Sequence, residues 1–412
     1  MADDTLLVDG KPASSQTAAR DARIGQTAVY YLAFSLLGMT YAAVGPTIAN
    51  LALQTHSEVS QISYLLTARW VGYLIGSLVG GRLYDRFRGH VVMAAMLVLV
   101  AVTTAAVPTV PQLGVLVAVL IIYGIGAGAV DVGGNTLLIW VHGRRVGPWM
   151  NALHFFYGLG AFIAPLIVAQ VVLRTGDFRW TYWLIALLVL PAILSAWLTP
   201  SPDRRTTSAD GSAVPFDGRL VALFAVFLFL VVAAESSFAD WISPYALARG
   251  LSDVNSAYVA SAFWGALMFA RLLFIPIAAR VKPSSVLLSN IVGCAVGAGL
   301  ILLAPGSVVA LAAGAVIFGL SVAVMIPSAL TLAGNRMHVT GRVTGWFLVG
   351  ASLGGMSMPR LIGQMFVPVG PWSAIAAILV TVLGMFVVYP FLVRARPGEA
   401  SRPGAGPERE AL

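Results

Sequence analysis

The sequence predicts an all-α membrane protein in which twelve transmembrane helices form two pseudo-symmetric six-helix bundles. Hydrophobic residues make up 58% of the 412-residue chain and charged residues only 10%, whereas a soluble domain carries about 25% charged residues. The mean hydropathy of +0.87 agrees with this. A spanning helix needs about 20 mostly apolar residues, and runs of this length recur along the whole chain, with a polar segment near its middle.

The predicted spans follow one another with short connections. They cover residues 27–53, 61–83, 90–108, 112–140, 147–173, 179–198, 219–246, 254–276, 285–304, 306–333, 342–366 and 371–393. The first six make an N-terminal bundle, 27–198, and the last six a C-terminal bundle, 219–393. Residues 199–218 are rich in Pro, Ser, Thr, Gly and Asp, which is typical of a domain linker. Residues 1–26 and 394–412 are expected to be cytoplasmic tails, the second of them disordered.

Basic residues are unevenly distributed over the connections. With both termini inside, the cytoplasmic loops hold Arg82, Arg86, Arg88, Arg144, Arg145, Arg204, Arg205, Arg219, Arg280, Lys282, Arg336 and Arg342. The outer loops hold Arg174, Arg179 and Arg249. Twelve against three is the bias of the positive-inside rule. We therefore expect cytoplasmic termini and a multi-pass protein of the plasma membrane, which is the inner membrane of a bacterial cell. The net charge of +8 then reflects topology and not binding to nucleic acid.

Several kinds of site are missing from the sequence. The single cysteine, Cys294, lies within a predicted span, so neither an intramolecular disulfide nor a cysteine metal cluster can form. The two lysines, Lys11 and Lys282, do not close a GxxxxGK[ST] phosphate-binding loop, and no HExxH or GxSxG motif occurs. The first 20 residues show no signal peptide. The sequence predicts a protein that is not an enzyme, binds no metal or cofactor and draws energy from an ion gradient.

The two bundles resemble each other in sequence. Gly160 to Pro165 in the fifth span parallels Gly354 to Pro359 in the eleventh at an offset of 194, and Gln170 and Gln364 follow at the same offset. Related repeats that pack about a central cavity are the arrangement in which transporters bind solute near the middle of the membrane. Gln364 is therefore a candidate for solute binding.

The fourth and fifth spans carry polar residues that a lipid-facing helix would avoid. Asp131 and Asn135 share one helix face, and Asn151 and His154 share another. An ionised carboxylate in the membrane centre costs about 2.5–3.5 kcal/mol, so such residues usually face the bundle interior. Asp131 either takes up the coupling proton or cation, or neutralises a buried arginine. His154 either relays a proton or is a structural hydrogen-bonding group. Asn135 and Asn151 are candidates for solute binding.

The seventh and eighth spans carry the matching polar residues of the C-terminal bundle. Glu235 is a second candidate for proton or cation coupling, and Asp240 is expected to be solvated or to cap the outer end of its helix. Ser261, Trp264 and Arg271 lie on one helix face. An indole packs against the C–H groups of a sugar ring while polar side chains bind its hydroxyls, so this face is a candidate for solute binding; the alternative for Trp264 is core packing.

Three arginines, Arg69, Arg271 and Arg360, lie inside predicted spans and away from the span ends. Counting helical rise from the loops places Arg69, Glu235 and Arg360 in the outer half of the membrane, and Arg271 and Asp131 in the inner half. Unpaired buried charges are strongly destabilising. We therefore expect Arg69 and Arg360 to form charge pairs with acids across the two bundles, which rearrange during transport.

The sequence also resembles known families. The segment GRLYDRFRGH, Gly81 to His90, resembles the signature loop of the major facilitator superfamily, which implies that Asp85 and Arg86 latch the inner ends of the bundles. Asp131 and Asn135, the segment NALHFFYGLGAFIAP, and Glu235, Trp264 and Arg271 are similar to the fucose:proton symporter family and its sodium-glucose relatives. That pattern includes a carboxylate on the first span, where residues 30–53 of this chain contain neither Asp nor Glu.

The sequence thus predicts a monomeric secondary transporter that works by alternating access and takes up a sugar or similar small polar solute together with a proton. Sodium in place of the proton is one alternative. A proton-driven efflux antiporter for drugs or metabolites is another, because Gly160 to Pro165 partly resembles the proline motif of antiporters. A third is a receptor or scaffold that transports nothing and binds a protein partner.

Overall fold

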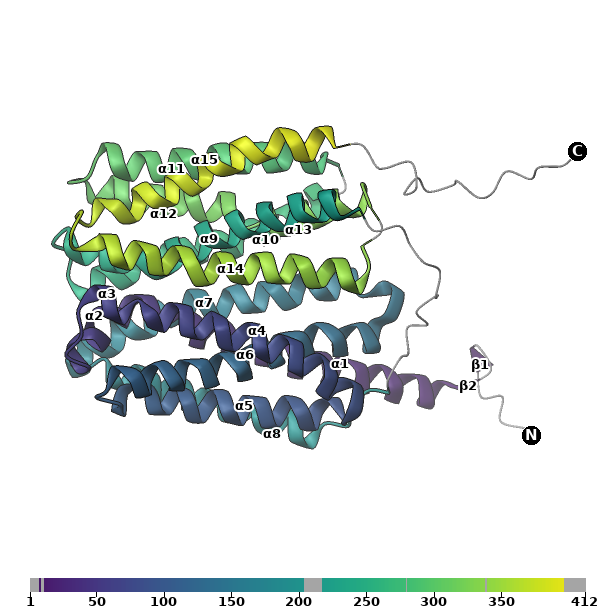
Figure 1. Ribbon diagram of the computed structural model, residues 1–412. Coiled ribbons are helices and arrows are strands. Elements are labelled where there is room, and N and C mark those ends of the chain that lie inside the picture. The colour runs from purple at the N-terminus through teal and green to yellow at the C-terminus, as the bar shows by residue number, and fades with distance from the viewer. Residues whose placement is uncertain (1–6, 9–10, 204–216, 279, 338, 396–412) are drawn as a thin grey trace, which may run out of the picture.

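A computed structural model describes residues 7–8, 11–203, 217–278, 280–337 and 339–395. The described chain is a bundle of long helices that run side by side in alternating directions (Figure 1). We call the end where α1 begins and α15 finishes the terminal end, and the opposite end the distal end; in Figure 1 the terminal end lies on the right. Residues 204–216 of the predicted linker, and all of the predicted C-terminal tail beyond residue 395, lie outside the described residues.

Helices α1 to α8 build the N-terminal half and helices α9 to α15 the C-terminal half. The N-terminal half contains β1 (Leu7–Val8), β2 (Lys11–Pro12), α1 (Ala13–Ala42), α2 (Val44–Gln54), α3 (Val59–Ile62), α4 (Tyr64–Arg86), α5 (Gly89–Ala106), η1 (Val107–Thr109), α6 (Leu113–His142), η2 (Gly143–Arg145), α7 (Gly147–Thr175) and α8 (Arg179–Leu198). The C-terminal half contains α9 (Gly218–Ala248), α10 (Asp253–Ala278), α11 (Pro283–Leu303), α12 (Val308–Val322), α13 (Met325–Gly334), α14 (Gly341–Phe366) and α15 (Trp372–Arg394). The short strands β1 and β2 pair antiparallel outside the bundle.

The helices match the predicted all-α membrane class. In the described part of the chain, ten helices are long and apolar enough to cross a membrane, and the bent pair Arg20–Ala42 and Val44–Gln54, with a 47° bend, makes eleven. The 26-residue helix α14 corresponds to the remaining predicted span and packs lengthwise against α9 and α4. Its glycines, serines, Arg360 and Gln364 lower its hydropathy, because this helix faces protein along much of its length.

The N-terminal region differs from the prediction of a tail over residues 1–26. Helix α1 already begins at Ala13, well before the expected start of the first span. The segment from Ala13 to Ile24 contains several alanines and neither proline nor glycine, so nothing interrupts the helix. Arg20 and Arg23 are exposed. The first helix therefore extends beyond the apolar span at the terminal end.

Helices α4 and α6 approach each other closely through glycines. A Cβ added at Gly128 of α6 would collide with the backbone carbonyl of Tyr73 in α4, and one added at Gly124 would collide with the carbonyl of Arg69. Small residues allow such approach of transmembrane helices. These two glycines thus bring the backbones of α4 and α6 together, and the same contact places Tyr73 beside the turn of α6 that carries Asp131.

We expect Gly128→Ala to lower the thermal stability of the purified protein, because the added methyl group forces α4 and α6 apart. Overpacking of this kind costs about 1–3 kcal/mol. The measurement is the midpoint of thermal unfolding in detergent. Gly114→Ala is the matched control, since Gly114 lies on the same helix with open space around it. Equal midpoints for the two variants would contradict this account of the contact.

Candidate functional site

A cavity of about 550 Å³ lies between the two halves. Helices α1, α4, α6 and α7 of the N-terminal half line it, together with α9, α10 and α13 of the C-terminal half. Its lining reaches Val281 and Pro283, next to the loop between α10 and α11, and Asn151 near the start of α7. Val281 and Asn151 are exposed. The cavity therefore opens at the terminal end of the bundle.

Asp131 faces this cavity and is held by neutral donors. The hydroxyl of Tyr73 donates to Asp131 Oδ2 at 2.6 Å, and Asn135 Nδ2 donates to the backbone oxygen of Asp131 at 2.9 Å and to Oδ1 at 3.4 Å. Within the described ranges, no arginine, lysine or histidine lies within ion-pair distance of Asp131. This geometry does not fit a carboxylate whose role is to neutralise a buried arginine. Asn135 supports Asp131 from one turn away and does not line the cavity itself.

The second cavity carboxylate, Glu235 on α9, faces Arg271 on α10 at 3.9 Å. Both side chains are partly exposed, at 17% and 19%, and Arg271 Nε also donates to the backbone oxygen of Ala323 at 3.2 Å. The expected separation of these two charges into an outer and an inner layer is wrong. Helical rise places Cα atoms, whereas these long side chains carry their charges several ångströms from the backbone and reach toward each other.

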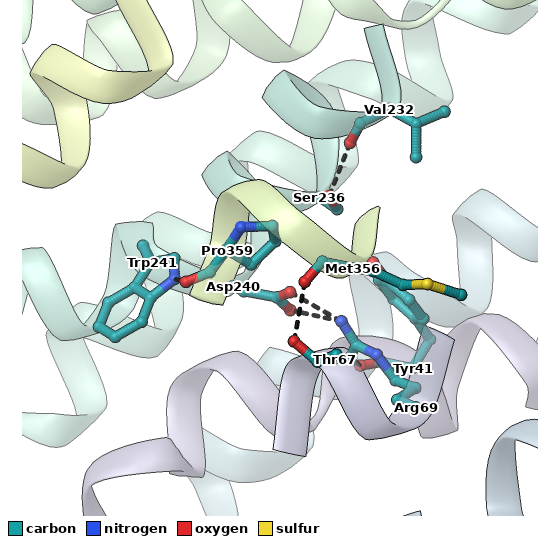
Figure 2. A network of polar contacts seen from close by, with 9 residues as sticks. All are labelled: Tyr41, Thr67, Arg69, Val232, Ser236, Asp240, Trp241, Met356 and Pro359. Carbon is teal, nitrogen blue, oxygen red and sulfur yellow. Dashed lines mark hydrogen bonds and ion pairs between the residues drawn. The ribbon is translucent and has the colours of Figure 1, made fainter. Parts of the chain in front are cut away.

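Arg69 and Asp240 form a buried ion pair across the two halves (Figure 2). Arg69 Nη2 donates to the two carboxylate oxygens at 2.7 and 3.0 Å, and the side chains are 3% and 2% exposed. The guanidinium also lies 3.9 Å from the centre of the Tyr41 ring. The solvated or capping role expected for Asp240 is wrong, because α2 covers this turn of α9: Gly45 packs directly against Asp240. The predicted cross-bundle pairing of Arg69 has Asp240 as its partner.

Further contacts close the distal end beside this pair. Thr67 of α4 donates to the backbone oxygen of Met356 in α14 at 2.8 Å (Figure 2). Gln364 Nε2 donates to the backbone oxygen of Ser60 at 2.8 Å, and Arg360 Nη2 donates to the hydroxyl of Tyr64 at 2.9 Å. Gln364 therefore lies outside the cavity, contrary to the prediction that it binds solute. Arg360 packs on a tyrosine where an acid was expected, since α14 presents it to the N-terminal end of α4.

Aromatic rings make up the wall of the cavity near its closed end. Trp264, predicted from the sequence, is 2% exposed and lines the cavity together with Tyr41, Trp70, Tyr73 and Tyr157. Tyr41 lies at the centre of this group, with its ring centroid 6.0 Å from that of Trp264, 6.4 Å from Trp70 and 6.5 Å from Tyr157. The centroids of Tyr157 and Trp264 are 6.5 Å apart, and those of Trp70 and Tyr73 are 5.3 Å apart. Sequence reasoning missed the other four rings. Of these four, only Tyr73 could have been found from the sequence, because it follows the buried Arg69 by four residues and therefore shares a helix face with it.

The remaining candidates occupy different places. His154 lines the cavity, with its ring edge-on to Phe34 at 5.9 Å, and Asn151 lies at the mouth. Ser261 is buried outside the cavity and donates to the backbone oxygen of Phe162 at 2.9 Å, so it joins α10 to α7 instead of facing solute. Asp85 and Arg86 are exposed in the last turn of α4 at the terminal end, away from the cavity.

Comparisons with known proteins agree with this geometry. The model of the family described as the Major Facilitator Superfamily matches residues 30–359. The chain is similar to "Sodium-dependent glucose transporter 1" of Xenopus laevis, 28% identical over 85% of this chain and 79% of that protein. It is also similar to "Sodium-dependent glucose transporter 1A" of Mus musculus, 27% identical over 86% and 92%. "Major facilitator superfamily domain-containing protein 4A" of Homo sapiens is 24% identical over 92% and 94%.

Two solved structures share the fold. The crystal structure of a D-xylose-proton symporter matches with a TM-score of 0.70 and 16% identity, covering 88% of this chain and 97% of that one. The crystal structure of a mutant of the nucleoside transporter NupG matches with a TM-score of 0.72 and 14% identity, covering 90% and 99%. At these identities the likeness is one of fold.

Proposed function

Because this chain belongs to the major facilitator superfamily, we propose that it carries a sugar or a similar small polar solute across the membrane by alternating access, driven by a cation gradient. The chain is a multi-pass membrane transporter and not an enzyme. The observation that carries the proposal is the cavity between the two halves, where the carboxylate of Asp131 lies in the same space as an aromatic wall.

Alternating access is supported by the contrast between the two ends of the cavity. The terminal end is open beside Val281, whereas the distal end is closed by the Arg69–Asp240 pair and the neighbouring contact of Thr67 with α14. Each of these distal contacts joins the two halves, so a relative movement of the halves would break them together. That movement would expose the same cavity to the opposite side.

A sugar fits the chemistry of the cavity wall. Apolar contact comes from the rings of Tyr41, Trp70, Tyr157 and Trp264. Hydrogen-bond donors and acceptors come from Arg271, Glu235 and His154, which line the same cavity. Apolar walls with a few convergent polar groups are typical of small-molecule sites. The names of two similar proteins, which are called sodium-dependent glucose transporters, support the same solute class.

Asp131 is the group we propose to bind the coupling cation. Three carboxylates lie in the cavity or at the closed distal end. Asp240 is paired with Arg69 and Glu235 with Arg271, whereas Asp131 is held by neutral donors. A bound cation would neutralise this remaining charge when solute fills the cavity. We propose a proton, with sodium as the alternative that the names of the relatives support. Uptake in sodium-free buffer with an imposed pH gradient decides between them.

We further propose that the protein lies in the plasma membrane with both termini in the cytoplasm and works as a monomer. The proposal of orientation rests on the distribution of arginine and lysine over the loops. In that orientation the terminal end faces the cytoplasm, and the cavity described above is open to the inside. Asp85 and Arg86 then lie on the cytoplasmic side, where they are proposed to latch the halves when the cavity faces out.

A thermal-shift panel of sugars, polyols, amino acids and drugs tests the solute class. We expect a hexose to raise the unfolding midpoint, since a ligand present at about 100 times its Kd stabilises the folded state by about 2.7 kcal/mol.

Trp264→Ala is expected to weaken hexose binding by about tenfold or more, because about 1.4 kcal/mol of lost contact corresponds to a factor of ten. Trp197→Ala is the matched control and should bind like the unchanged protein, because Trp197 is exposed on α8, outside the cavity.

Other outcomes of the panel point to other functions. Stabilisation by drugs with no response to any sugar would contradict the proposed solute and favour an efflux antiporter. Equal hexose binding by the Trp264 and Trp197 variants would show that the aromatic wall does not contact the solute.

A further inference from the structure

Tyr73 connects the proposed cation site to the proposed solute site. Its hydroxyl donates to Asp131 Oδ2 at 2.6 Å, while its ring packs against Trp70 with centroids 5.3 Å apart. Tyr73 itself lines the cavity and is half-buried. One side chain therefore contacts both the carboxylate and the aromatic wall.

The backbone holds Tyr73 in this position. Gly128 lies three residues before Asp131 on α6, and its Cα packs against the backbone carbonyl of Tyr73 so closely that no side chain would fit. Because residues three apart share a helix face, this contact fixes the position of Tyr73 along the helix axis relative to Asp131. The Tyr73 side chain thus lies beside the Asp131 carboxylate and lines the cavity.

The strength of this hydrogen bond depends on the charge of Asp131. A hydrogen bond to an ionised carboxylate is about twice as strong as one to a neutral acceptor. The bond from Tyr73 to Asp131 is therefore strongest when the carboxylate is ionised and carries no cation. A proton or cation on Asp131 would make the carboxylate a weaker acceptor, and the phenol hydroxyl, which also has acceptor lone pairs, would become available to the cavity.

We propose that Tyr73 couples cation binding to solute binding: it stays bonded to Asp131 when the carboxylate is empty, and turns to a hydroxyl of the solute when a cation occupies Asp131. This inference rests on the proposed function and assigns Tyr73 a direct contact with the solute in the cation-bound state. Binding of the cation thus raises solute affinity without any direct contact between the two ligands.

The other ionisable groups around Asp131 are few. The ionisable groups that share its cavity are Arg69 and Tyr73 from α4, His154 from α7, Glu235 from α9, Arg271 from α10, and Tyr41, Tyr123 and Tyr157 from α1, α6 and α7. Helix α5 also packs against α6. Its His90 is buried and forms hydrogen bonds with the hydroxyl of Tyr30 and the backbone oxygen of Thr199. Of all these groups, only Tyr73 is hydrogen-bonded to the Asp131 carboxylate besides Asn135, as far as the described residues show.

The test is the cation dependence of the hexose KM in reconstituted vesicles. Tyr73→Phe keeps the ring and removes only the hydroxyl. In the unchanged protein we expect KM to fall by about two- to tenfold when the cation is added, which is the range that one hydrogen bond supplies. In Tyr73→Phe we expect that fall to disappear, because phenylalanine offers no hydroxyl to the solute whether or not a cation occupies Asp131.

Tyr123→Phe is the matched control. Tyr123 lines the same cavity, but its hydroxyl bonds to Thr40 at 2.9 Å, so the variant loses a buried hydroxyl without touching Asp131. It should keep the full cation dependence. Retained dependence in Tyr73→Phe, or equal loss in Tyr123→Phe, would overturn the role of Tyr73 and leave the proposed function standing. If the unchanged protein moves hexose without any cation effect, the inference and the coupling role of Asp131 both fail, and if it moves no hexose, the proposed solute fails as well.

Discussion

Asp131→Asn is expected to abolish concentrative uptake while preserving exchange of solute across the membrane. The asparagine side chain has nearly the same shape and can still accept from Tyr73, but it is permanently neutral. A carrier that no longer needs a cation to neutralise this position can switch between its inward-open and outward-open conformations whether or not a cation is bound. Solute then reaches equilibrium across the vesicle membrane and does not accumulate.

The measurement is a pair of assays on the same reconstituted vesicles. Counterflow, in which labelled hexose exchanges for unlabelled hexose without a gradient, should persist, and gradient-driven accumulation should vanish. Asp253→Asn is the control, because Asp253 lies in the first turn of α10, outside the cavity. Accumulation that survives in Asp131→Asn would move the coupling role to Glu235 or His154.

Asp240→Asn is expected to open the distal end of the bundle. The change leaves Arg69 buried with no opposite charge, and breaking a buried ion pair in this way costs about 3–5 kcal/mol. Under the proposed alternating access, the distal end is closed in the conformation described here and open in the opposite one, so the cost falls on the conformation described here. A bias of about 5.5 kcal/mol moves a two-state equilibrium from 1:99 to 99:1, and the expected shift in population is therefore large.

Thiol labelling measures this opening with little background. Cys294 is the only cysteine of the chain and is buried, so Cys294→Ala gives a protein without thiols. Ser63, fully buried against Gly363 of the other half, can then be changed to cysteine. Labelling from the distal side should be slow in this background and fast when Asp240→Asn is added.

A double variant separates gating from general damage. Arg69→Leu together with Asp240→Leu removes both charges, and apolar replacement of a buried ion pair is often neutral or stabilising. Slow labelling should return in this protein. Fast labelling in both variants would show that the distal end is held by something other than balanced charge.

The sequence was sufficient for the membrane class and for four residues of the cavity lining, because both follow from one-dimensional patterns. Apolar runs mark the helices directly. Asp131, Glu235 and Arg271 are conspicuous where apolar residues are expected, and Trp264 shares a helix face with Arg271. All four line the cavity. The roles we assign to them stay proposals.

The partners of these residues could not be predicted, since they depend on packing between distant segments. The position of Asp240 near the outer end of its predicted span suggests a solvated residue, but α2 covers it. Arg271 and Glu235 meet through long side chains, which helical rise does not describe. Gln364 matched Gln170 in the repeat, yet it lies at the distal contact and not in the cavity.

The aromatic wall was missed for a related reason. Tyrosine and tryptophan are common in membrane helices, at interfaces as well as in sites, so a single ring carries little information. Tyr41, Trp70 and Tyr157 become significant only because three different helix positions converge on one cavity. No spacing within the sequence shows that convergence.

The most direct test of the central claim is hexose accumulation in vesicles that contain the purified protein and an imposed cation gradient. The account predicts that labelled hexose rises above its outside concentration when a proton or sodium gradient points inward, and returns to equilibrium when an ionophore collapses that gradient. Hexose uptake that stops at equilibrium with both gradients in place would contradict cation-coupled transport through this cavity.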